Sequence, residues 1–313
     1  MRGYEALREG VGWLNLSQRG RIRATGEDRV RLLHAMTTND IRQLEPGQGC
    51  YAFFLNVQGR ILADAVVLAM PDALVIDTEP ETRSSLYGHL DKYIIADDVA
   101  LEDVTETTIE IGIEGPAAFE VLEKLGAPAP AAPYWHAQWS EATVARFSTT
   151  GRAGFSVIAP AAARDALIRD LEAAGAISAD TEAARTARLE QGCPRYGEDI
   201  TERHIPHETQ LLSGVNFNKG CYIGQEIVER VRSRGGVHRF LVGLEIDADR
   251  PPSTDARITA GGKEVGEITS AAYSPALGRT AALAYVRTGE IPPGAELSVE
   301  GNRARITAGK PSR

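Results

Sequence analysis

The sequence has few cysteines and no long apolar segment. Only 3 of its 313 residues are cysteine (Cys50, Cys193 and Cys221), and their odd number and wide spacing suit neither a disulfide framework nor a zinc site. No stretch reaches the length needed to cross a bilayer, and the first 18 residues lack the apolar core of a secretion signal. We therefore expect a cytoplasmic chain whose cysteines are thiols, with no membrane partner.

The chain also lacks an excess of positive charge. Its net charge of −9 argues against a general polyanion binder, including direct binding of tRNA, because neutralising phosphates needs clustered Lys and Arg. One local cluster exists nevertheless, consisting of Arg230, Arg232, Arg234, His238 and Arg239. It is either a solvated basic face or a site for an anionic ligand.

The order of apolar patterns predicts an α+β protein. The first unit, residues 1–104, is expected to contain strands at 19–26, 50–57, 61–70, 73–77 and 97–103 and helices at 27–40 and 81–95. A similar order follows in residues 105–238, with strands at 107–115, 142–147 and 155–159 and helices at 116–126 and 161–175. Six short strands between 240 and 308, separated by Gly and Pro, predict a small β-barrel at 239–313. The two α+β units are expected to be of ferredoxin-like type.

The strongest candidate for chemistry is Cys221, in the octapeptide KGCYIGQE. The run IGQEIVERV that follows has helical spacing, so Cys221 should lie at or just before a helix N-terminus. There the helix dipole and the ammonium of Lys219 would favour thiolate over thiol. Cys221 is thus a candidate nucleophile or transient iron ligand, although no His or Asp lies close in sequence to complete a triad. The alternative is a small buried residue in a glycine turn.

Carboxylates and amides form a second group of candidates. Glu190 lies where a helix runs into a Gly turn, and Glu208 lies in IPHE. A buried carboxylate can accept two parallel N–H donors, the pattern on the pyrimidine edge of a pterin or guanine. The alternative is a surface glutamate or an ion pair with Arg188 or Arg195. Asp64, within the apolar strand ILADAVV, lies either on a solvent face or at a site in the sheet centre.

The segment NFNKGCYIGQEIVERV resembles the signature loop of the YgfZ family, which includes related mitochondrial iron–sulfur assembly factors. Upstream, TTNDI, GQGCYAFFLNVQGRILAD and LDKYIIADDVALED resemble the amino-terminal half that this family shares with the glycine-cleavage aminomethyltransferases. RLEQGCPRYGEDITERHIPHE is similar to the folate-site region of both groups, and VGEITSAAYSPALGRTAALAYV to their C-terminal barrel. The similarity covers nearly the whole chain.

The resemblance implies a cloverleaf of three domains around a central opening that holds tetrahydrofolate, with no stable metal. Glu190 would match the glutamate that binds the pterin. Further folate-site candidates are Asn39, Glu208 and Gln225, and, from charge, Arg230 and Arg239 at the glutamate tail. The predicted catalytic residues are Cys221, Lys219 and Asp64.

Two departures bear on the predicted activity. Aminomethyltransferases carry two adjacent aspartates where this chain has Ala63 and Asp64, and they lack the KGCYIGQE loop. The resemblance therefore favours a tetrahydrofolate-binding accessory factor for assembly or repair of iron–sulfur clusters in client enzymes, including those that thiolate tRNA. Its partners would be those clients or assembly proteins. The alternatives are a tetrahydrofolate-dependent aminomethyl or one-carbon transferase, and a non-enzymatic binder of tRNA or protein that uses residues 230–239.

Overall fold

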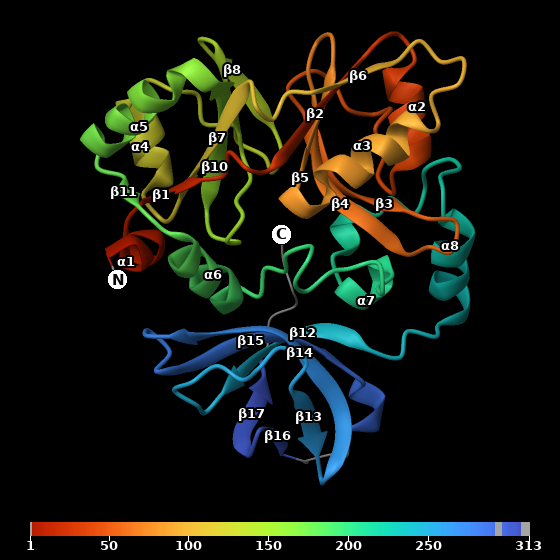
Figure 1. Ribbon diagram of the computed structural model, residues 1–313, viewed down its shortest axis with the longest axis vertical. Coiled ribbons are helices and arrows are strands. Elements are labelled where there is room, and N and C mark those ends of the chain that lie inside the picture. Colours follow the sequence, from red (N-terminus) through yellow and green to blue (C-terminus); the bar gives the residue numbers. More distant parts are fainter. Residues whose placement is uncertain (1, 292–295, 308–313) are drawn as a thin grey trace.

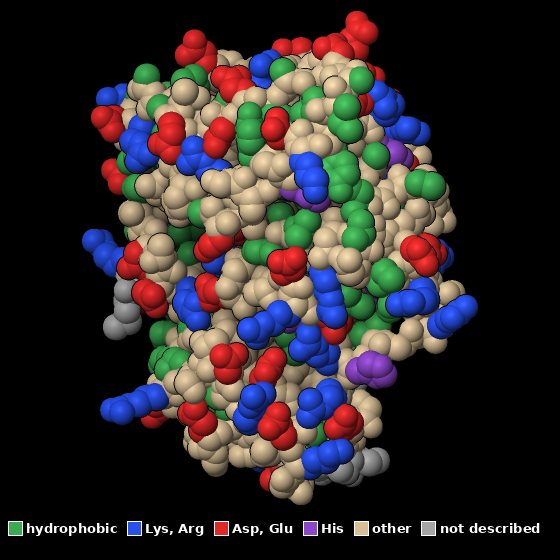
Figure 2. All heavy atoms as spheres, turned by 45° about the vertical axis from the view of Figure 1, so that its right-hand side comes forward, with side chains coloured by type: hydrophobic (Ala, Val, Ile, Leu, Met, Phe, Trp, Pro, Cys, Tyr) green, Lys and Arg blue, Asp and Glu red, His purple; other side chains and the backbone are tan. Residues whose placement is uncertain are grey.

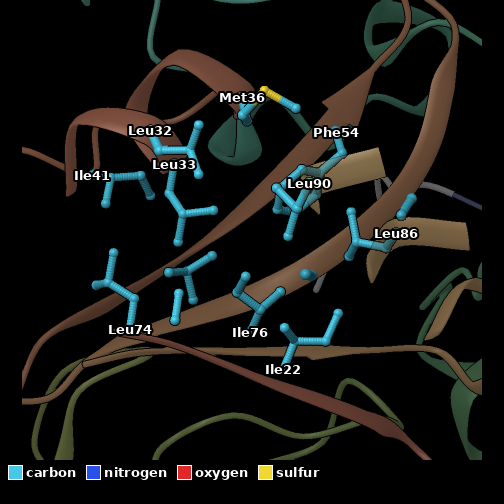
Figure 3. Close-up of a cluster of buried hydrophobic side chains, with 14 of the residues drawn as sticks. Ile22, Leu32, Leu33, Met36, Ile41, Phe54, Leu74, Ile76, Leu86 and Leu90 are labelled. Carbon is cyan, nitrogen blue, oxygen red and sulfur yellow. The ribbon is translucent and has the colours of Figure 1, made fainter. Parts of the chain in front are cut away.

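The first sheet has five antiparallel strands and is covered by helices on one face. The strand order is β3 (Gly49–Leu55), β4 (Ile61–Ala69), β5 (Leu74–Thr78), β2 (Gly20–Thr25) and β6 (Ala100–Asp103). The helices are α2 (Arg29–Met36) and α3 (Arg83–Asp91), the latter preceded by the 3-10 turn η1 (Pro80–Thr82). Figure 3 shows the apolar side chains of both helices gathered with Ile22, Phe54 and Ile76 of the sheet. This cluster is the core of the first unit.

The second sheet has six strands and a helical layer of its own. The strand order is β11 (Ile177–Ser178), β1 (Gly12–Asn15), β7 (Thr108–Glu114), β10 (Gly154–Pro160), β9 (Ala142–Ala145) and β8 (His136–Trp139). The apolar faces of α4 (Ala118–Lys124) and α5 (Arg164–Ala173) pack against it, and the 3-10 turn η2 (Ala161–Ala163) precedes α5. Strand β1 precedes the first unit in the chain but pairs within the second sheet, so the two units are interleaved.

The C-terminal unit is a closed barrel of six strands. Their order is β12 (Phe240–Ile246), β15 (Arg279–Val286), β14 (Lys263–Ser274), β13 (Arg257–Ala260), β16 (Leu297–Val299) and β17 (Asn302–Ile306), and the 3-10 turn η4 (Thr288–Glu290) follows β15. Leu, Ile, Val and Ala side chains fill its interior. Two helices connect the units, α1 (Arg2–Glu9) and α6 (Thr181–Glu190); α6 packs on α1 and on strands β14 and β15 of the barrel.

The chain that leads into the barrel contains α7 (Pro206–Thr209), η3 (Leu212–Gly214) and α8 (Gln225–Arg234). The computed structural model describes residues 2–291 and 296–307 and shows three lobes, with α6 and α7 between the barrel and the two upper units (Figure 1).

The predicted α+β class with a C-terminal barrel is confirmed. The last two predicted strands include Ala295 and Ala308, which lie outside the described residues. The domain boundaries at 104 and 238 and the cytoplasmic location stay predictions, and no helix within the described ranges is long and apolar enough to span a bilayer.

The inner faces of the two sheets meet in a layer of buried charges, which we call the charged layer. Its members come from the inner faces or ends of strands and are Arg19, Arg21, Asp77, Glu79 and Glu110. The Arg19 guanidinium donates to Asp77 at 2.7 Å and also pairs with Glu79. Because side chains alternate along a strand, the polar positions of β2 face the second sheet while Ile22 and Ala24 face the helices.

Arg21 is fully buried, and its guanidinium is saturated with acceptors. It donates to the carbonyls of Ser17, Arg19 and Thr105 at 2.9 Å each. Its charge is paired with Glu110 at 3.4 Å. Burial and the neighbouring Asp77 carboxylate raise the pKa of Glu110 well above its usual range, and Arg19 and Arg21 oppose that rise. The layer is therefore stable only when each member keeps its partners.

Replacing Arg21 with Met should lower the free energy of unfolding by about 3–5 kcal/mol, because the buried Glu110 carboxyl loses its closest cation and three carbonyls lose a donor. Arg23→Met is the matched control, since Arg23 lies two residues along the same strand and pairs with Asp72, whose side chain is 73% exposed. The control should lose less than about 1 kcal/mol. Urea unfolding followed by circular dichroism measures both, and equal losses would contradict a structural role for the charged layer.

Candidate functional site

Two cavities lie where the two units meet, on either side of Arg19. The first has a volume of about 250 Å³ and the second of about 370 Å³, and both are lined by Arg19 and Thr149. Residues 146–154 and Tyr134 form much of the first wall, while α6 and residues 194–198 form much of the second. The second cavity falls within the size range of ordinary small-molecule sites, and the first lies just below it.

The cavity walls combine aromatic side chains with arginines that are already paired. Tyr134 and Phe147 line the first cavity, as do Arg146 and Arg152. In the second cavity, Arg188 donates to Asp199 at 2.7 Å and to Glu198 at 2.8 Å, and Arg195 donates to Glu81 at 2.6 Å. The walls therefore offer N–H donors and aromatic surface without a large net positive charge.

Glu190 lies at the end of α6 with both carboxylate oxygens in use. Oε1 accepts hydrogen bonds from the hydroxyls of Tyr4 and, at 2.6 Å, Ser274. Oε2 accepts from Arg152 at 2.8 Å and lies 3.7 Å from Arg8. The ion pair is thus made with Arg152 and Arg8 and not with Arg188 or Arg195. Because Arg152 lines the first cavity, a ligand in that cavity meets Arg152 before it meets Glu190.

Asp64 lies in β4 and is 1% exposed. It is therefore buried in the sheet and does not lie on a solvent face. Tyr51 donates its hydroxyl to the carboxylate at 2.7 Å, and Thr78 donates to the Asp64 carbonyl at 2.7 Å. Burial, aided by the charge of Asp64, raises the pKa of Tyr196 to about 12. Neighbouring Ala63 belongs to the apolar core beneath α2 and α3. Asp64 is therefore directed to the face of the sheet opposite that core.

Lys219 fastens the KGCYIGQE loop to the end of α2. Its buried ammonium donates to the carbonyls of His34 at 2.5 Å, Thr37 at 2.7 Å and Asn39 at 2.8 Å, and it lies 5.0 Å from the centre of the Tyr222 ring. All three N–H donors are thereby used. Burial lowers the pKa of Lys219 to about 8. Its predicted influence on the Cys221 thiol stays a prediction.

Further contacts tie this loop and the chain segment before it to the first unit. Asn39 donates to the carbonyls of Tyr51 at 2.9 Å and Ser213 at 3.1 Å, so this predicted folate ligand joins two segments of the chain. Gly224 precedes α8 with φ of +84°, and a Cβ there would come within 2.7 Å of the Asn56 carbonyl oxygen. Only glycine suits such a turn. Gln225 is the first residue of α8, so the helix predicted after Cys221 is present.

The three cysteines differ in exposure. Cys221 is exposed, whereas Cys50 and Cys193 are buried and burial raises the pKa of Cys50 to about 12. Cys221 is thus the thiol that a large reagent or a partner protein can reach. Within residues 2–291 and 296–307, no three His, Cys, Asp or Glu side chains are arranged to hold a metal ion.

Two of the predicted folate ligands pair with each other. Glu208 accepts from the N–H of Ile205 at 3.1 Å and from Arg239 at 2.9 Å, and Arg239 lies 5.1 Å from the Tyr285 ring centre. These contacts join α7 to the barrel, and neither Glu208 nor Arg239 lines the two central cavities. Arg230 is exposed on α8; Figure 2 shows Lys and Arg side chains projecting from this side of the molecule.

Several charged residues of the centre were not predicted from the sequence, among them Arg19, Asp77, Glu110 and Arg152. Arg19, Asp77 and Glu110 could have been suspected, because each lies in a segment predicted as a strand. Side chains alternate between the two faces of a strand, and each of these residues lies at a position where one face can be buried. The alternation defines two faces of a strand and does not tell what covers each face. Arg152 lies in a loop, and its partner Glu190 is 38 residues away.

Comparison with known proteins gives matches along almost the whole chain. The GCVT N-terminal domain matches residues 1–219, and the glycine cleavage T-protein C-terminal barrel domain matches residues 239–311. An aminomethyltransferase of Rubrobacter xylanophilus is 30% identical over 290 residues, which are 90% of this chain and 78% of that protein. One from Nostoc sp. is 30% identical, with 96% of this chain and 83% of that protein covered.

A chloroplastic Arabidopsis thaliana protein named as a transferase is 31% identical, and the match covers 85% of this chain but only 63% of the plant protein's length. Among solved structures, the glycine cleavage system aminomethyltransferase T from Bartonella henselae superposes with a TM-score of 0.88. That match covers 99% of this chain and 88% of the other at 22% identity. At this identity the structural likeness establishes the fold.

Replacing Lys219 with Met should release the loop from α2 and lower its local stability by about 1–3 kcal/mol, because three charge-assisted hydrogen bonds are lost. Hydrogen exchange of the Ile223 amide, which donates to the Ala35 carbonyl, should become at least about tenfold faster. Lys124→Met is the control, since exposed Lys124 also donates to a carbonyl but lies far from the loop in the second unit. Unchanged protection of Ile223 in Lys219→Met would show that Lys219 does not hold the loop.

Proposed function

The chain belongs to the glycine cleavage T-protein (aminomethyltransferase) family, and we propose that it binds a tetrahydrofolate at its centre and serves iron–sulfur enzymes through Cys221. The observation that carries this proposal is the KGCYIGQE loop, which presents an exposed thiol from a backbone fastened to the first unit. Its resemblance to the YgfZ signature adds the iron–sulfur client as the proposed partner.

The residues around the two central cavities suit a ligand of folate's kind. A pterin needs a flat, partly aromatic site with hydrogen-bonding groups, and Tyr134, Phe147 and Arg152 line the first cavity. A glutamate tail needs N–H donors, which Arg185 and Arg195 bring to the second cavity. Bound tetrahydrofolate would supply a carrier for a one-carbon unit. Glu190 would reach the pterin only if Arg152 gave up its place on the carboxylate.

Exposure of Cys221 suits work on a second macromolecule. A thiolate can transiently take iron or sulfur from a client, or exchange with a client disulfide, provided that the client can reach it. The exposed arginines of α8 follow directly in sequence and would favour a client with an acidic surface. In this proposal the iron–sulfur cluster is cargo and the chain holds no resident metal.

Aminomethyl transfer to tetrahydrofolate is the second candidate function. The observation that favours it is the position of Ala63, whose side chain lies in the apolar core of the first unit, while Asp64 lies on the opposite face. Aminomethyltransferases have an aspartate where this chain has Ala63. Because position 63 points away from the face that carries Asp64, its replacement by alanine leaves the carboxylate on that face in place. The names of the relatives point to the same chemistry.

Calorimetric titration with tetrahydrofolate tests the common premise of both candidates. The wild type should bind, and Glu190→Ala should bind at least about tenfold more weakly, because Arg152 then loses the carboxylate that orients it. Glu208→Gln is the control: its carboxylate is occupied by Arg239 and it lines neither central cavity, so its affinity should match the wild type. Failure of the wild type to bind would remove both candidates.

Two assays on the same proteins separate the candidates. An accessory role predicts that Cys221→Ser lowers the activity of iron–sulfur client enzymes while folate binding is kept. Aminomethyl transfer predicts formation of methylenetetrahydrofolate from an aminomethyl-lipoyl carrier protein, abolished by Asp64→Asn and unaffected by Cys221→Ser. Full client activity with Cys221→Ser would remove this thiol from the proposed function.

A further inference from the structure

His34 occupies the space between Asp40 and the Cys221 loop. It lies in the last turn of α2 and is only 4% exposed. Its Nδ1 lies 3.2 Å from Oδ1 of Asp40. Its Nε2 lies 3.8 Å from the point that a Cβ on Gly220 would occupy, and Gly220 immediately precedes Cys221. The imidazole therefore extends from a carboxylate to the backbone beside the thiol, although 187 positions separate His34 from Cys221 in the sequence.

The loop is anchored to this histidine on both sides of Cys221. Two residues before the cysteine, Lys219 donates to the carbonyl of His34 at 2.5 Å. Two residues after it, the N–H of Ile223 donates to the carbonyl of Ala35 at 3.1 Å. Cys221 is thus held between two contacts with adjacent residues of one helix turn. The absence of a side chain at Gly220 leaves the ring and the loop backbone in direct proximity.

The surroundings of the ring favour its neutral form. Burial and the Lys219 ammonium lower the pKa of His34, Arg42 lowers it further, and Asp40 opposes them. A hydrogen on Nδ1 then faces the Asp40 carboxylate, which leaves Nε2 as the acceptor. Nδ1 is buried and forms no regular hydrogen bond within the described ranges, so its contact with Asp40 is the electrostatic approach at 3.2 Å. The buried imidazole therefore directs Nε2 at the backbone of the loop that carries the exposed thiol.

We propose that Cys221, His34 and Asp40 form a thiol–imidazole–carboxylate relay for thiol–disulfide exchange with a client. This inference rests on the proposed function only in taking Cys221 as the reactive thiol. The thiol and the ring form no direct hydrogen bond in the structure, and the relay requires the exposed cysteine to turn onto the ring when a client disulfide docks, as catalytic contacts commonly tighten on binding.

The exchange is balanced without an external oxidant. Nε2 of His34 takes the proton of Cys221, and the sulfur electron pair forms a bond to one sulfur of the client disulfide. The client S–S bond breaks, its electron pair leaves on the second sulfur, and that thiolate takes the proton back from the imidazolium. Asp40 stabilises the imidazolium while it exists and is a positioning residue, as it never touches the client.

The test is the rate at which the native protein reacts with dithiodipyridine, a small disulfide that reports each exchange by its released thione. Cys50 and Cys193 are buried, and a Cys221→Ser protein gives the background. The wild-type rate should show an inflection on the acid side of neutrality, where His34 titrates. His34→Gln should lose that inflection and react at least about tenfold more slowly at neutral pH, and Asp40→Asn should react several-fold more slowly.

His89→Gln is the control, because this histidine lies on α3 of the same unit, away from the loop, and should keep the wild-type profile. Tetrahydrofolate binding measured on the same variants should be unchanged, which separates failure of the relay from failure of the proposed function. Asp40→Asn keeps the inference testable if His34→Gln does not fold, since Asp40 is partly exposed. The relay would be overturned if His34→Gln and Asp40→Asn both kept the wild-type rate and pH dependence of the reaction with dithiodipyridine. If only Asp40→Asn folds, the same result in that variant alone would overturn it.

Discussion

The charged groups buried between the two sheets need partners there, because water does not reach them. Arg19 and Arg21 bring two guanidinium groups into this layer, and Asp77, Glu79 and Glu110 supply the carboxylates. Such a set tolerates one arrangement of its members far better than any other, because a displaced partner leaves a charge unpaired and out of reach of water. The layer thus fixes how the two units pack.

The central cavities inherit their geometry from that packing. Arg19 belongs to the charged layer and also lines both cavities, so the walls of the candidate ligand site are set by the same ion pairs that join the sheets. The Cys221 loop follows the same principle on a smaller scale. There, one buried ammonium is satisfied by three backbone carbonyls, and a segment far along the chain is held on the first unit.

Local pattern predicted much of the fold and little of the site. The strands around Ile22 and Ile76 and the helices carrying Leu33 and Leu86 were found because their apolar periodicity reflects a real core. The two-residue strand β11 and the four-residue strand β1 are too short for a periodic signal, and α1 and β1 lie in a segment to which no element was assigned.

Contacts between residues far apart in the sequence were the second feature that local pattern could not predict. The hydrogen bond from Arg239 to the Glu208 carboxylate could not be read from the chain context of either residue. The proximity of His34 to the Cys221 loop likewise exists only in the folded chain.

A crystal structure of the protein with a stable reduced folate would locate the proposed ligand site. We expect folate density in the cavities on either side of Arg19, with the pterin near Arg152 and with the ion pairs of Arg19 to Asp77 and Glu79 intact. Folate bound elsewhere, for example along α8, or a ligand that displaces Arg19 from its carboxylates, would show that the junction of the two units is not the folate site.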